Sequence, residues 1–287
     1  MKASTLVSGS EQELAEALAA LRTRGRESEE AVPGPEVVVT GSARPDPAPL
    51  LDSFPGAVGS EDPDPIVLTT ARLSEVIEFR PRDLTIEVGA GMRMRELLRL
   101  LEERGLWLPV SGEGLERSVG GWVAAGSPSM WDSAFGPVRR QLLGCRMLTT
   151  AGETLNWGRH VMKNVAGYDL SRLMAGALGT LGVLLEVSLK VIPAPPVERT
   201  LVLKASHDRA LQQMRELARQ PAPLSGACHL DELLYLRLSG NSASVASWEK
   251  QIGGDSGGGD DFWERLRDQR LPFFESDRPL CRVSLRP

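Results

Sequence analysis

Gly176-Ala177-Leu178-Gly179-Thr180-Leu181-Gly182 runs directly into an alternating apolar stretch over 183–192, and this junction decides the fold. Glycine at every third position prevents a stable helix over 176–182, because glycine loses the most backbone entropy on ordering. The alternation that follows predicts a long strand, one side of which is formed by Val183, Leu185, Val187, Leu189 and Val191. A strand that opens at once after a tight turn presents main-chain N–H and C=O groups to a planar ring. In a Rossmann fingerprint the glycines instead follow a strand and open a helix, so NAD binding is disfavoured.

A second glycine-rich stretch lies upstream, with the sequence Gly120-Gly121-Trp122-Val123-Ala124-Ala125-Gly126. It belongs to the most glycine-dense region of the chain, 112–126, where we expect regular structure to be interrupted. Without a Cβ in the way, backbone N–H groups approach a ligand closely, and a pyrophosphate is the natural guest. An ordinary glycine-rich turn is the alternative interpretation.

A third candidate phosphate contact follows the short apolar run Val37-Val38-Val39. That run is typical of a buried strand, and it ends in Thr40-Gly41-Ser42, a small-residue turn of the kind that can hold a phosphate. Upstream of it, Ser10 and Glu13 form a capping box, which predicts a helix that ends at Gly25.

Further elements complete the first part of the chain. Apolar runs predict strands at 66–68, 84–88, 142–148 and 154–157, and the alternation over 84–88 places Leu84, Ile86 and Val88 on one buried face. Gly89-Ala90-Gly91 opens a helix that ends at Gly105, with Met94, Leu97, Leu98 and Leu101 on its apolar face. The arginines opposite indicate a solvated face, with a docking surface as the alternative. A proline-rich stretch over 44–65 predicts an irregular, flexible loop.

Three prolines, Pro193, Pro195 and Pro196, break the strand over 183–192 and mark a domain boundary. We therefore divide the chain into residues 1–195 and 196–287. The second part has its own rhythm of strands at 201–203, 228–230 and 233–238 and helices at 208–219 and 243–252. This β-α-β-β-α order is most of a ferredoxin-like split βαβ, whose last strand is predicted at 282–285 after a flexible insert over 253–261.

Composition places the 287-residue chain among ordinary globular proteins, with 41% hydrophobic and 25% charged residues. A net charge of −5 gives no global attraction to nucleic acid or to an anionic membrane. The sequence has no apolar run long enough to span a bilayer and no signal-peptide core at its start, so we expect a cytoplasmic protein. Its 3 cysteines and 3 histidines are scattered, and their spacing indicates neither a disulfide framework nor a metal site.

The stretch from Arg159 to Val183 carries a resemblance to a known family. Before the glycine turn it reads Met162-Lys163-Asn164-Val165-Ala166-Gly167-Tyr168-Asp169-Leu170-Ser171-Arg172-Leu173-Met174-Ala175. This stretch resembles the flavin-binding signature of the vanillyl-alcohol oxidase and p-cresol methylhydroxylase (PCMH) superfamily, and most narrowly that of the E subunits of bacterial glycolate oxidases. The similarity extends in weaker form over 37–195, and the segments 271–274 and 282–285 resemble a later region of those subunits.

The resemblance implies an α+β fold, in which a PCMH-type FAD-binding domain of two α+β subdomains over 1–195 precedes a ferredoxin-like cap over 196–287. FAD would lie between the two subdomains. The first phosphate loop of the family matches Thr40, Gly41 and Ser42. The second matches Ser118, Gly120, Gly121, Val123, Ala124 and Gly126. The turn and strand start that touch FAD through the main chain match Gly179, Gly182 and Val183.

Several side chains near these loops have two interpretations each. Lys163 and Asn164 would face the flavin, where a lysine stabilises the reduced ring or meets a carboxylate, or else Lys163 is a surface residue. Arg139 would neutralise the pyrophosphate or be solvated. Tyr168 and Asp169 would order the turn, or Tyr168 simply packs. Covalent flavin attachment needs a His or Cys at the ring, and 105–135 contains neither, so we expect noncovalent FAD.

Three features depart from the family pattern. The turn Thr40-Gly41-Ser42 is poorer in glycine than the first phosphate loop of the wider superfamily, as it is in the E subunits themselves. Arg140 stands where many relatives carry an acidic residue, which reverses the local charge. The chain also ends before the family's C-terminal segment near the flavin, so we expect a truncated cap and weaker retention of the cofactor.

The resemblance implies a flavoprotein oxidoreductase, the FAD-binding subunit of a hetero-oligomeric glycolate (2-hydroxy acid) oxidase that converts glycolate to glyoxylate. In such an oxidation a base takes the hydroxyl proton while hydride goes to the flavin, and the sequence identifies no catalytic base. Substrate chemistry is therefore expected in a companion flavoprotein subunit. Electrons would leave through an iron–sulfur subunit, and any inner-membrane attachment would be made through these partners. A stand-alone FAD-dependent hydroxy-acid dehydrogenase and a flavin-free assembly subunit are the alternatives.

Overall fold

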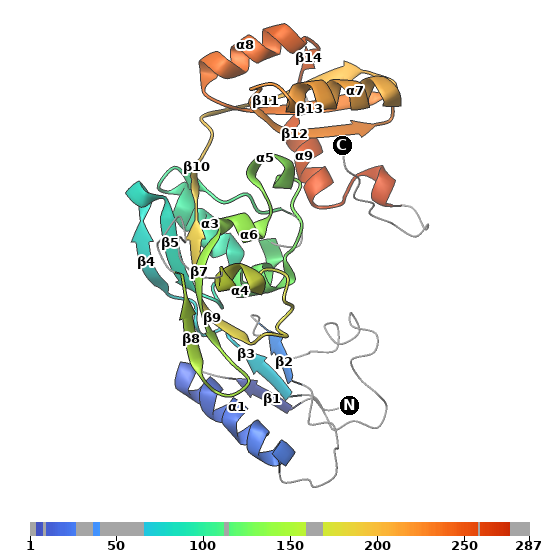
Figure 1. The fold of residues 1–287 in the computed structure, drawn as a ribbon. Helices are drawn as coiled ribbons and strands as arrows, with labels where there is room; N and C mark the ends of the chain where they lie inside the picture. The colour runs from blue at the N-terminus through green and yellow to red at the C-terminus, as the bar shows by residue number, and fades with distance from the viewer. Residues whose placement is uncertain are drawn as a thin grey trace. The chain divides into compact units, whose positions relative to one another are not determined.

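The computed structural model describes residues 4–7, 10–26, 37–40, 66–111, 115–158, 169–257 and 259–275. The chain forms two compact units (Figure 1). The first consists of Met1–Leu108, Gly114–Ser127 and Val138–Ile192, and the second of Pro109–Glu113, Pro128–Pro137 and Pro193–Pro287. The main segment of the second unit thus begins at the proline cluster, and two short segments from earlier in the chain join it.

The first unit contains a three-stranded parallel sheet in the order β1-β3-β2. Its strands are β1 (Ser4–Val7), β2 (Val37–Thr40) and β3 (Ile66–Thr69), which confirms the strands predicted at 37–39 and 66–68. Because parallel strands run in one direction, the carboxyl ends of β2 and β3 lie together, with Thr40 opposite Thr69.

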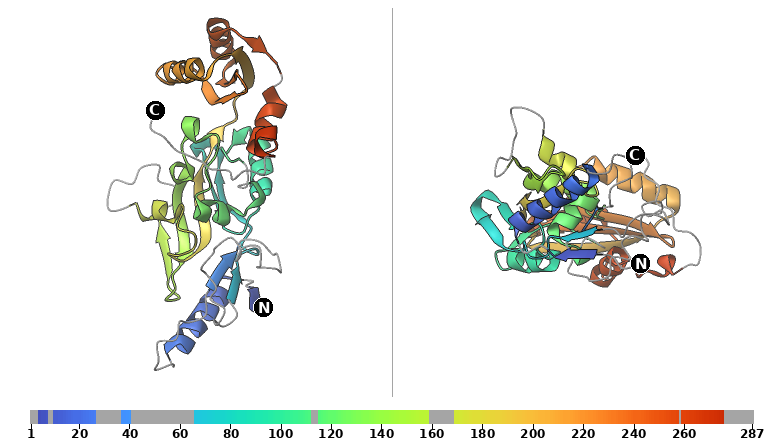
Figure 2. Two further views of the ribbon diagram at one scale, coloured as in Figure 1. Left: turned by 90° about the vertical axis from the view of Figure 1, so that its right-hand side faces the viewer. Right: turned by 90° about the horizontal axis from the view of Figure 1, so that it is seen from below.

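Helix α1 (Glu11–Arg26) packs beside this sheet. Its start confirms the predicted capping, because Ser10 Oγ accepts a hydrogen bond from the Glu13 N–H at 3.3 Å. The ribbon shows α1 beside the parallel sheet (Figures 1 and 2). Its buried side chains join one hydrophobic cluster with β3 and with two strands of the five-stranded sheet, made of Leu14, Leu18, Leu68, Leu148, Val183 and Leu185. Fully burying one such side chain contributes about 1.5–3 kcal/mol, so this cluster is the main attachment of α1.

A five-stranded antiparallel sheet in the order β4-β5-β9-β7-β8 forms the rest of the first unit's core. Its strands are β4 (Val76–Arg80), β5 (Thr85–Gly89), β7 (Leu142–Leu148), β8 (Thr154–Trp157) and β9 (Val183–Lys190). The bounds predicted for β7 and β8 are confirmed. The edge strand β4 was missed, since Val76 and Ile77 are exposed and give no buried run.

Strands β5 and β9 are covered on both faces, whereas the alternation predicted one buried face for each. All of β5 is buried, including Glu87 at 3% exposure. Helix α4 (Val119–Ala125) packs against β5 and β9, α6 (Val138–Gln141) packs against β7 and β9, and α1 contacts the start of β9. The remaining elements of this unit are η1 (Pro81–Asp83), α3 (Met94–Glu102), β6 (Leu106–Trp107), η3 (Leu170–Met174) and the start of β10 (Ile192–Pro193).

The second unit contains a four-stranded antiparallel sheet in the order β12-β13-β11-β14. In chain order its elements are β11 (Val197–Lys204), α7 (His207–Ala218), β12 (Leu224–Leu230), β13 (Leu233–Gly240), α8 (Ser242–Ile252), β14 (Asp255–Ser256), α9 (Gly259–Arg267) and η4 (Pro272–Phe274). The succession β-α-β-β-α-β, with its first and third strands in the middle of the sheet, is that of a split βαβ unit.

The fourth strand of this unit differs from the prediction. The segment 253–261, predicted to be a flexible insert, contains β14 and the first turn of α9. Its short strand pairs with β11 through Asp255 and Ser256. Two glycines with left-handed backbone, Gly253 and Gly254, make the tight entry into it. The segment 282–285, predicted to supply the last strand, lies outside the described residues.

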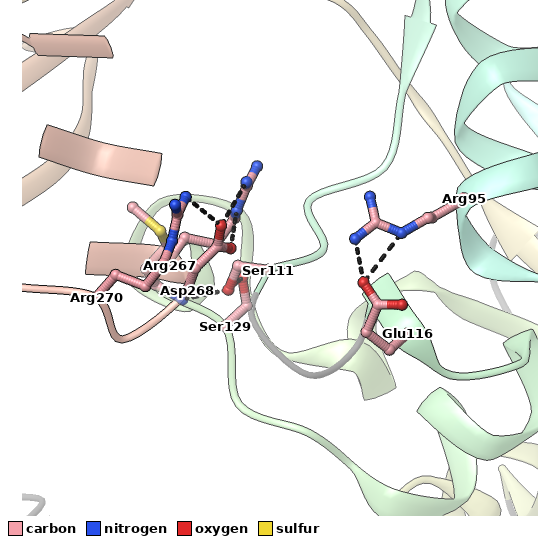
Figure 3. A network of polar contacts seen from close by, with 8 residues as sticks. Arg95, Ser111, Glu116, Ser129, Arg267, Asp268 and Arg270 are labelled. Atoms are coloured by element: carbon pink, nitrogen blue, oxygen red, sulfur yellow. Dashed lines mark hydrogen bonds and ion pairs between the residues drawn. The ribbon is translucent and has the colours of Figure 1, made fainter. Parts of the chain in front are cut away.

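Both faces of the second unit's sheet are covered. On one face α7 and α8 pack around a cluster centred on Leu201, Leu234, Leu236 and Leu238. On the other, α9 contributes Phe262 and Trp263, and Trp263 Nε1 donates a hydrogen bond to Thr200 Oγ1 at 2.9 Å. After α9 the carboxylate of Asp268 accepts hydrogen bonds from Arg267 and Arg270 (Figure 3).

The two short segments join the second unit through side chains. Ser111 Oγ donates a hydrogen bond to Ser129 Oγ at 3.0 Å and accepts one from the Met130 N–H at 3.1 Å (Figure 3). The guanidinium carbon of Arg237 lies 4.1 Å from the ring centroid of Trp131, which precedes α5 (Asp132–Phe135). The segments that flank α4 in sequence are therefore both parts of the second unit.

Cys145 offers a test of the five-stranded sheet. It lies in β7, opposite Val187 of β9 and Trp157 of β8, and burial raises the pKa of its thiol to about 12. Because the thiolate is the reactive form and an ordinary thiol has a pKa of about 8.5, Cys145 should resist alkylation by iodoacetamide at about that pH. After unfolding in urea it should react. Peptide mass spectrometry gives the answer, and alkylation in the folded protein as fast as in urea would contradict this placement.

Candidate functional site

Helix α4 occupies part of the glycine-rich region that was predicted to be irregular, so that prediction is wrong for Val119–Ala125. Two local features define this 7-residue helix. The N-cap Ser118 accepts a hydrogen bond on its Oγ from the Gly121 N–H at 3.1 Å, and Gly126 ends the helix with a φ of 57°. A helix this short is marginal by itself, so packing against its neighbours must hold it.

The start of α4 packs main chain on main chain against the turn after β5. The Gly120 N–H donates a hydrogen bond to the Ala90 carbonyl at 2.8 Å. A Cβ at Gly120 would lie 2.7 Å from Ala90 Cβ and 2.9 Å from the Ala90 carbonyl oxygen. Gly120 therefore has a packing role that the sequence analysis did not identify. At Gly121 the nearest atom to a Cβ would be Ser118 Oγ at 3.1 Å, so Gly121 is the less enclosed of the two glycines.

The turn after β5 also packs closely against the loop after β3. A Cβ at Gly91 would lie 1.9 Å from the Thr70 carbonyl oxygen, and a Cβ at Gly89 would lie 2.2 Å from the Leu73 carbonyl oxygen. Only glycine permits approaches this close. Thr70 directly follows β3, whose end pairs with the end of β2. The end of β2, where the first phosphate segment is predicted, is therefore connected to the start of α4, where the second is predicted. The connection is made by the contacts of β3, the loop after β3 and the turn after β5.

The other end of α4 meets the second glycine stretch. The carbonyls of Val123 and Ala124 accept hydrogen bonds from the N–H groups of Gly176 at 3.1 Å and Leu178 at 2.8 Å. A Cβ at Gly126 would lie 2.9 Å from Gly176 Cα, so Gly126 has no room for a larger residue. The structure thus brings three of the predicted residues, Val123, Ala124 and Gly126, against the turn that leads into β9.

Within that turn the glycines have different surroundings. A Cβ at Gly182 would lie 2.2 Å from Met147 Cε and 2.6 Å from the Leu148 carbonyl oxygen, so glycine is required here by packing on β7. Val183, the next residue, is buried at the start of β9 opposite Leu148. Gly179 has a φ of 79° and open space where a Cβ would be. Gly179 is therefore more accessible than Gly182 in this turn.

Other predicted site residues are spread more widely. Arg139 is exposed on α6. Asp169 accepts a hydrogen bond from Ser171 Oγ at 2.9 Å and pairs with Arg172 at 2.9 Å, so it orders the local turn. Outside the described residues lie Gly41, Ser42, Lys163, Asn164 and Tyr168.

The segments that meet around the start of α4 are positively charged. They carry one arginine each, namely 69–74 with Arg72, 89–93 with Arg93 and 117–126 with Arg117, and the acidic residue that follows the first of them, Glu75, is exposed. Glu116 directly precedes the third segment and is exposed. Its carboxylate accepts a hydrogen bond from Arg95 Nε of α3 at 3.0 Å (Figure 3). This charge distribution favours a ligand with negative charge, such as a diphosphate.

Apolar side chains lie beside the glycine turn. Leu173, Leu178 and Leu181 are 59%, 55% and 50% exposed. Leu178 also has a φ of 51°, a left-handed conformation that costs a non-glycine residue roughly 1–2 kcal/mol. A dinucleotide with an aromatic ring needs glycine main chain, hydroxyl groups, positive charge and exposed apolar side chains such as these leucines. The described residues therefore fit FAD.

Other kinds of chemistry find little support in the described segments. They contain no group of three His, Cys, Asp or Glu side chains that could hold a metal ion. None of the helices within these ranges has both the length and the apolar character to cross a membrane. The stretches 118–126 and 175–183 contain no His, Lys, Asp, Glu, Tyr or Cys, so they supply no acid or base. His207 and His229 lie in the second unit, with ring centroids 5.8 Å apart.

Comparison with known families agrees with this geometry. Residues 53–158, which include β3, the turn after β5 and α4, match a family model described as FAD binding domain. This part of the chain is therefore similar to the FAD binding domain family. A solved structure of alkyldihydroxyacetonephosphate synthase is similar with a TM-score of 0.68 over 93% of this chain and 54% of that chain, at 17% identity. This likeness confirms the predicted α+β fold.

Curated relatives of the chain are oxidoreductases by name. Glycolate oxidase subunit GlcE of Escherichia coli is 41% identical over 73% of this chain and 60% of that protein. Glycolate oxidase subunit GlcD of Bacillus subtilis is 29% identical over 53% of this chain and 33% of that protein. D-2-hydroxyglutarate dehydrogenase of Xanthomonas citri is 31% identical over 52% of this chain and 32% of that protein. The chain thus spans 60% or less of the length of each of these relatives.

Gly120→Ala should destabilise the protein, because the new methyl group would lie 2.7 Å from Ala90 Cβ. Overpacking of this kind costs about 1–3 kcal/mol, against a gain of about 1 kcal/mol in helix propensity. Gly121→Ala is the matched control in the same helix, and it should be at least as stable as the parent protein. Urea unfolding followed by circular dichroism compares them, and equal midpoints for the two variants would mean that α4 does not pack on Ala90.

Proposed function

We propose that this chain is the FAD-binding subunit of a glycolate, or 2-hydroxy acid, oxidase complex and that it holds FAD noncovalently. The observation that carries the proposal is the 41% identity to glycolate oxidase subunit GlcE of Escherichia coli over 73% of the chain. The contacts around α4 support it, because they gather the predicted phosphate segments and the glycine turn around one short helix.

The predicted residues divide into two groups around the cofactor. The diphosphate would be held by the end of β2 with Thr40, Gly41 and Ser42 and by the start of α4 with Ser118, Gly120 and Gly121, assisted by Arg139. The flavin side would be met by the main chain of Gly179, Gly182 and Val183, with Val123, Ala124 and Gly126 behind the turn and Lys163 and Asn164 nearby. Noncovalent binding follows from the absence of His and Cys over 105–135.

The residues of this chain would bind and orient the cofactor rather than move the substrate proton. When bound, FAD supplies a hydride acceptor for the hydroxy acid carbon. Neither glycine stretch carries a group that could take the hydroxyl proton. Substrate chemistry is therefore assigned to a companion flavoprotein subunit, and electron exit to an iron–sulfur subunit. The names of the GlcE and GlcD relatives, both subunits of glycolate oxidase, support a multi-subunit assembly.

Two other functions have an observation in their favour. The 31% identity to a D-2-hydroxyglutarate dehydrogenase favours a stand-alone FAD-dependent hydroxy-acid dehydrogenase. The hydrogen bonds that already occupy the Gly120 and Gly121 N–H groups favour a flavin-free assembly subunit. Purification of the full chain with and without the products of neighbouring genes, followed by visible spectra and glycolate-dependent dye reduction, separates the three.

Flavin bands in the chain, with dye reduction only in the complex, are the expected result. Dye reduction by the chain alone would replace the proposal with the stand-alone dehydrogenase. A spectrum without flavin bands after soaking in FAD, while the complex still assembles, would replace it with the assembly subunit.

Gly121→Val tests the phosphate contact directly. The valine side chain should abolish FAD uptake by blocking the approach to the main chain of α4, while the fold stays largely intact. Ala125→Val places the same side chain at the other end of α4 and should leave FAD uptake in place. Quenching of flavin fluorescence during titration measures both. Undiminished uptake by Gly121→Val, or equal loss in the two variants, would remove this loop from the site.

A further inference from the structure

Arg146 of β7 holds two carboxylates that come from different parts of the first unit. Its Nη1 donates a hydrogen bond to Glu186 Oε1 at 2.8 Å, and its Nη2 donates one to Glu11 Oε1 at 2.7 Å. Glu186 lies opposite Arg146 in the neighbouring strand β9, so the first contact stays within the sheet. Glu11 is the first residue of α1, so the second contact ties a helix to the sheet.

The surroundings strengthen this contact. Thr154 Oγ1 of β8 donates a further hydrogen bond to Glu11 Oε1 at 2.8 Å. The side chains of Arg146, Glu11 and Glu186 are 29%, 30% and 17% exposed, which shields them partly from water. The hydrogen bond with Glu186, together with the charges of both carboxylates, raises the pKa of Arg146 above its ordinary value. A planar guanidinium suits this arrangement, because its fork bonds two carboxylates in fixed directions and a lysine does not.

Helix α1 in turn carries the parallel sheet. Leu14 and Leu18 pack in one cluster with Leu68 of β3, the residue directly before the end of that strand. Hydrophobic contact is non-directional, so by itself it leaves a helix able to slide or turn on its partner. Charge-assisted hydrogen bonds have a defined geometry and select one position. The place of Glu11 therefore sets the place of α1 and, through α1, that of β3.

We propose that Arg146 is a positioning residue for FAD binding. By holding Glu11, Arg146 positions the carboxyl ends of β2 and β3 against the turn that packs on α4. Thr40 and the Ser118–Gly121 segment then face one diphosphate. This inference rests on the proposed function, because it requires both segments to contact FAD. Arg146 acts through Glu11 and α1, and it leaves the chemistry of the flavin unchanged.

Two isosteric substitutions separate this role from general stability. Glu11→Gln removes the charge on the α1 side of Arg146, and Glu186→Gln removes the same charge on the sheet side. Each variant of the full chain is titrated with FAD and with ADP, which carries the diphosphate but no flavin ring. Hydrogen exchange of the peptide covering the start of α1 and urea unfolding of the FAD-free protein are measured in parallel.

Glu11→Gln should weaken the affinity for FAD and for ADP by the same factor, about fivefold, as expected for a partly shielded ion pair. Exchange in α1 should become faster in this variant alone. Glu186→Gln should bind both ligands within about twofold of the parent protein, even if both variants unfold at the same lower urea concentration. Parent-like FAD affinity in Glu11→Gln, or an equal loss in both variants, would overturn the positioning role alone. A parent protein that takes up no FAD would overturn the proposed function as well.

Discussion

Direct packing of main chain on main chain around α4 is the constraint on which the rest of the first unit depends. At Gly91, Gly120 and Gly126 a single added carbon would lie 1.9, 2.7 and 2.9 Å from its neighbour. These approaches join three segments far apart in sequence, the loop after β3, the turn after β5 and the turn before β9. The helix they enclose has only 7 residues and is stable because of them.

This arrangement explains why glycine can serve both the fold and the ligand here. Gly120 and Gly182 are closed in by protein atoms, whereas Gly121 and Gly179 are more accessible. The enclosed glycines anchor the main chain, and the accessible glycines next to them in sequence place peptide groups at the surface. In the proposed site, positive charge at the start of α4 would mark the diphosphate side, and the exposed leucines beside the turn would mark the ring side. Through α1, Arg146 extends the same order to the parallel sheet.

Sequence patterns predicted an element well where a single local signal, such as an apolar run, determines its structure. The bounds 142–148 and 154–157 of β7 and β8 agree with the structure, because apolar runs bounded by a turn leave little choice. Three cases depended instead on tertiary contacts. Helix α4 needs its cap and its neighbours, Glu87 is buried in an inner strand against which α4 packs, and β14 is a strand only because β11 offers an edge.

The candidate site was predictable in its glycine stretches but not in how they are joined. Val123, Ala124 and Gly126 meet Gly176 and Leu178, and that the two stretches serve one ligand stays a prediction. Gly89 and Gly91 were predicted only to open a helix, although two glycines straight after a buried strand were an available signal for close backbone approach. Gly41, Ser42, Lys163 and Asn164 stay predictions, since they lie outside the described residues.

Hydrogen exchange of the full chain with and without FAD tests the central claim most directly. If α4 and the segments packed on it form the binding site, FAD should slow exchange together in the peptides covering 37–40, 89–93, 117–126 and 175–183. Peptides of α7 and α8 in the second unit should be unchanged. Protection confined to the second unit, or FAD bound with no change in the peptide of α4, would contradict the account.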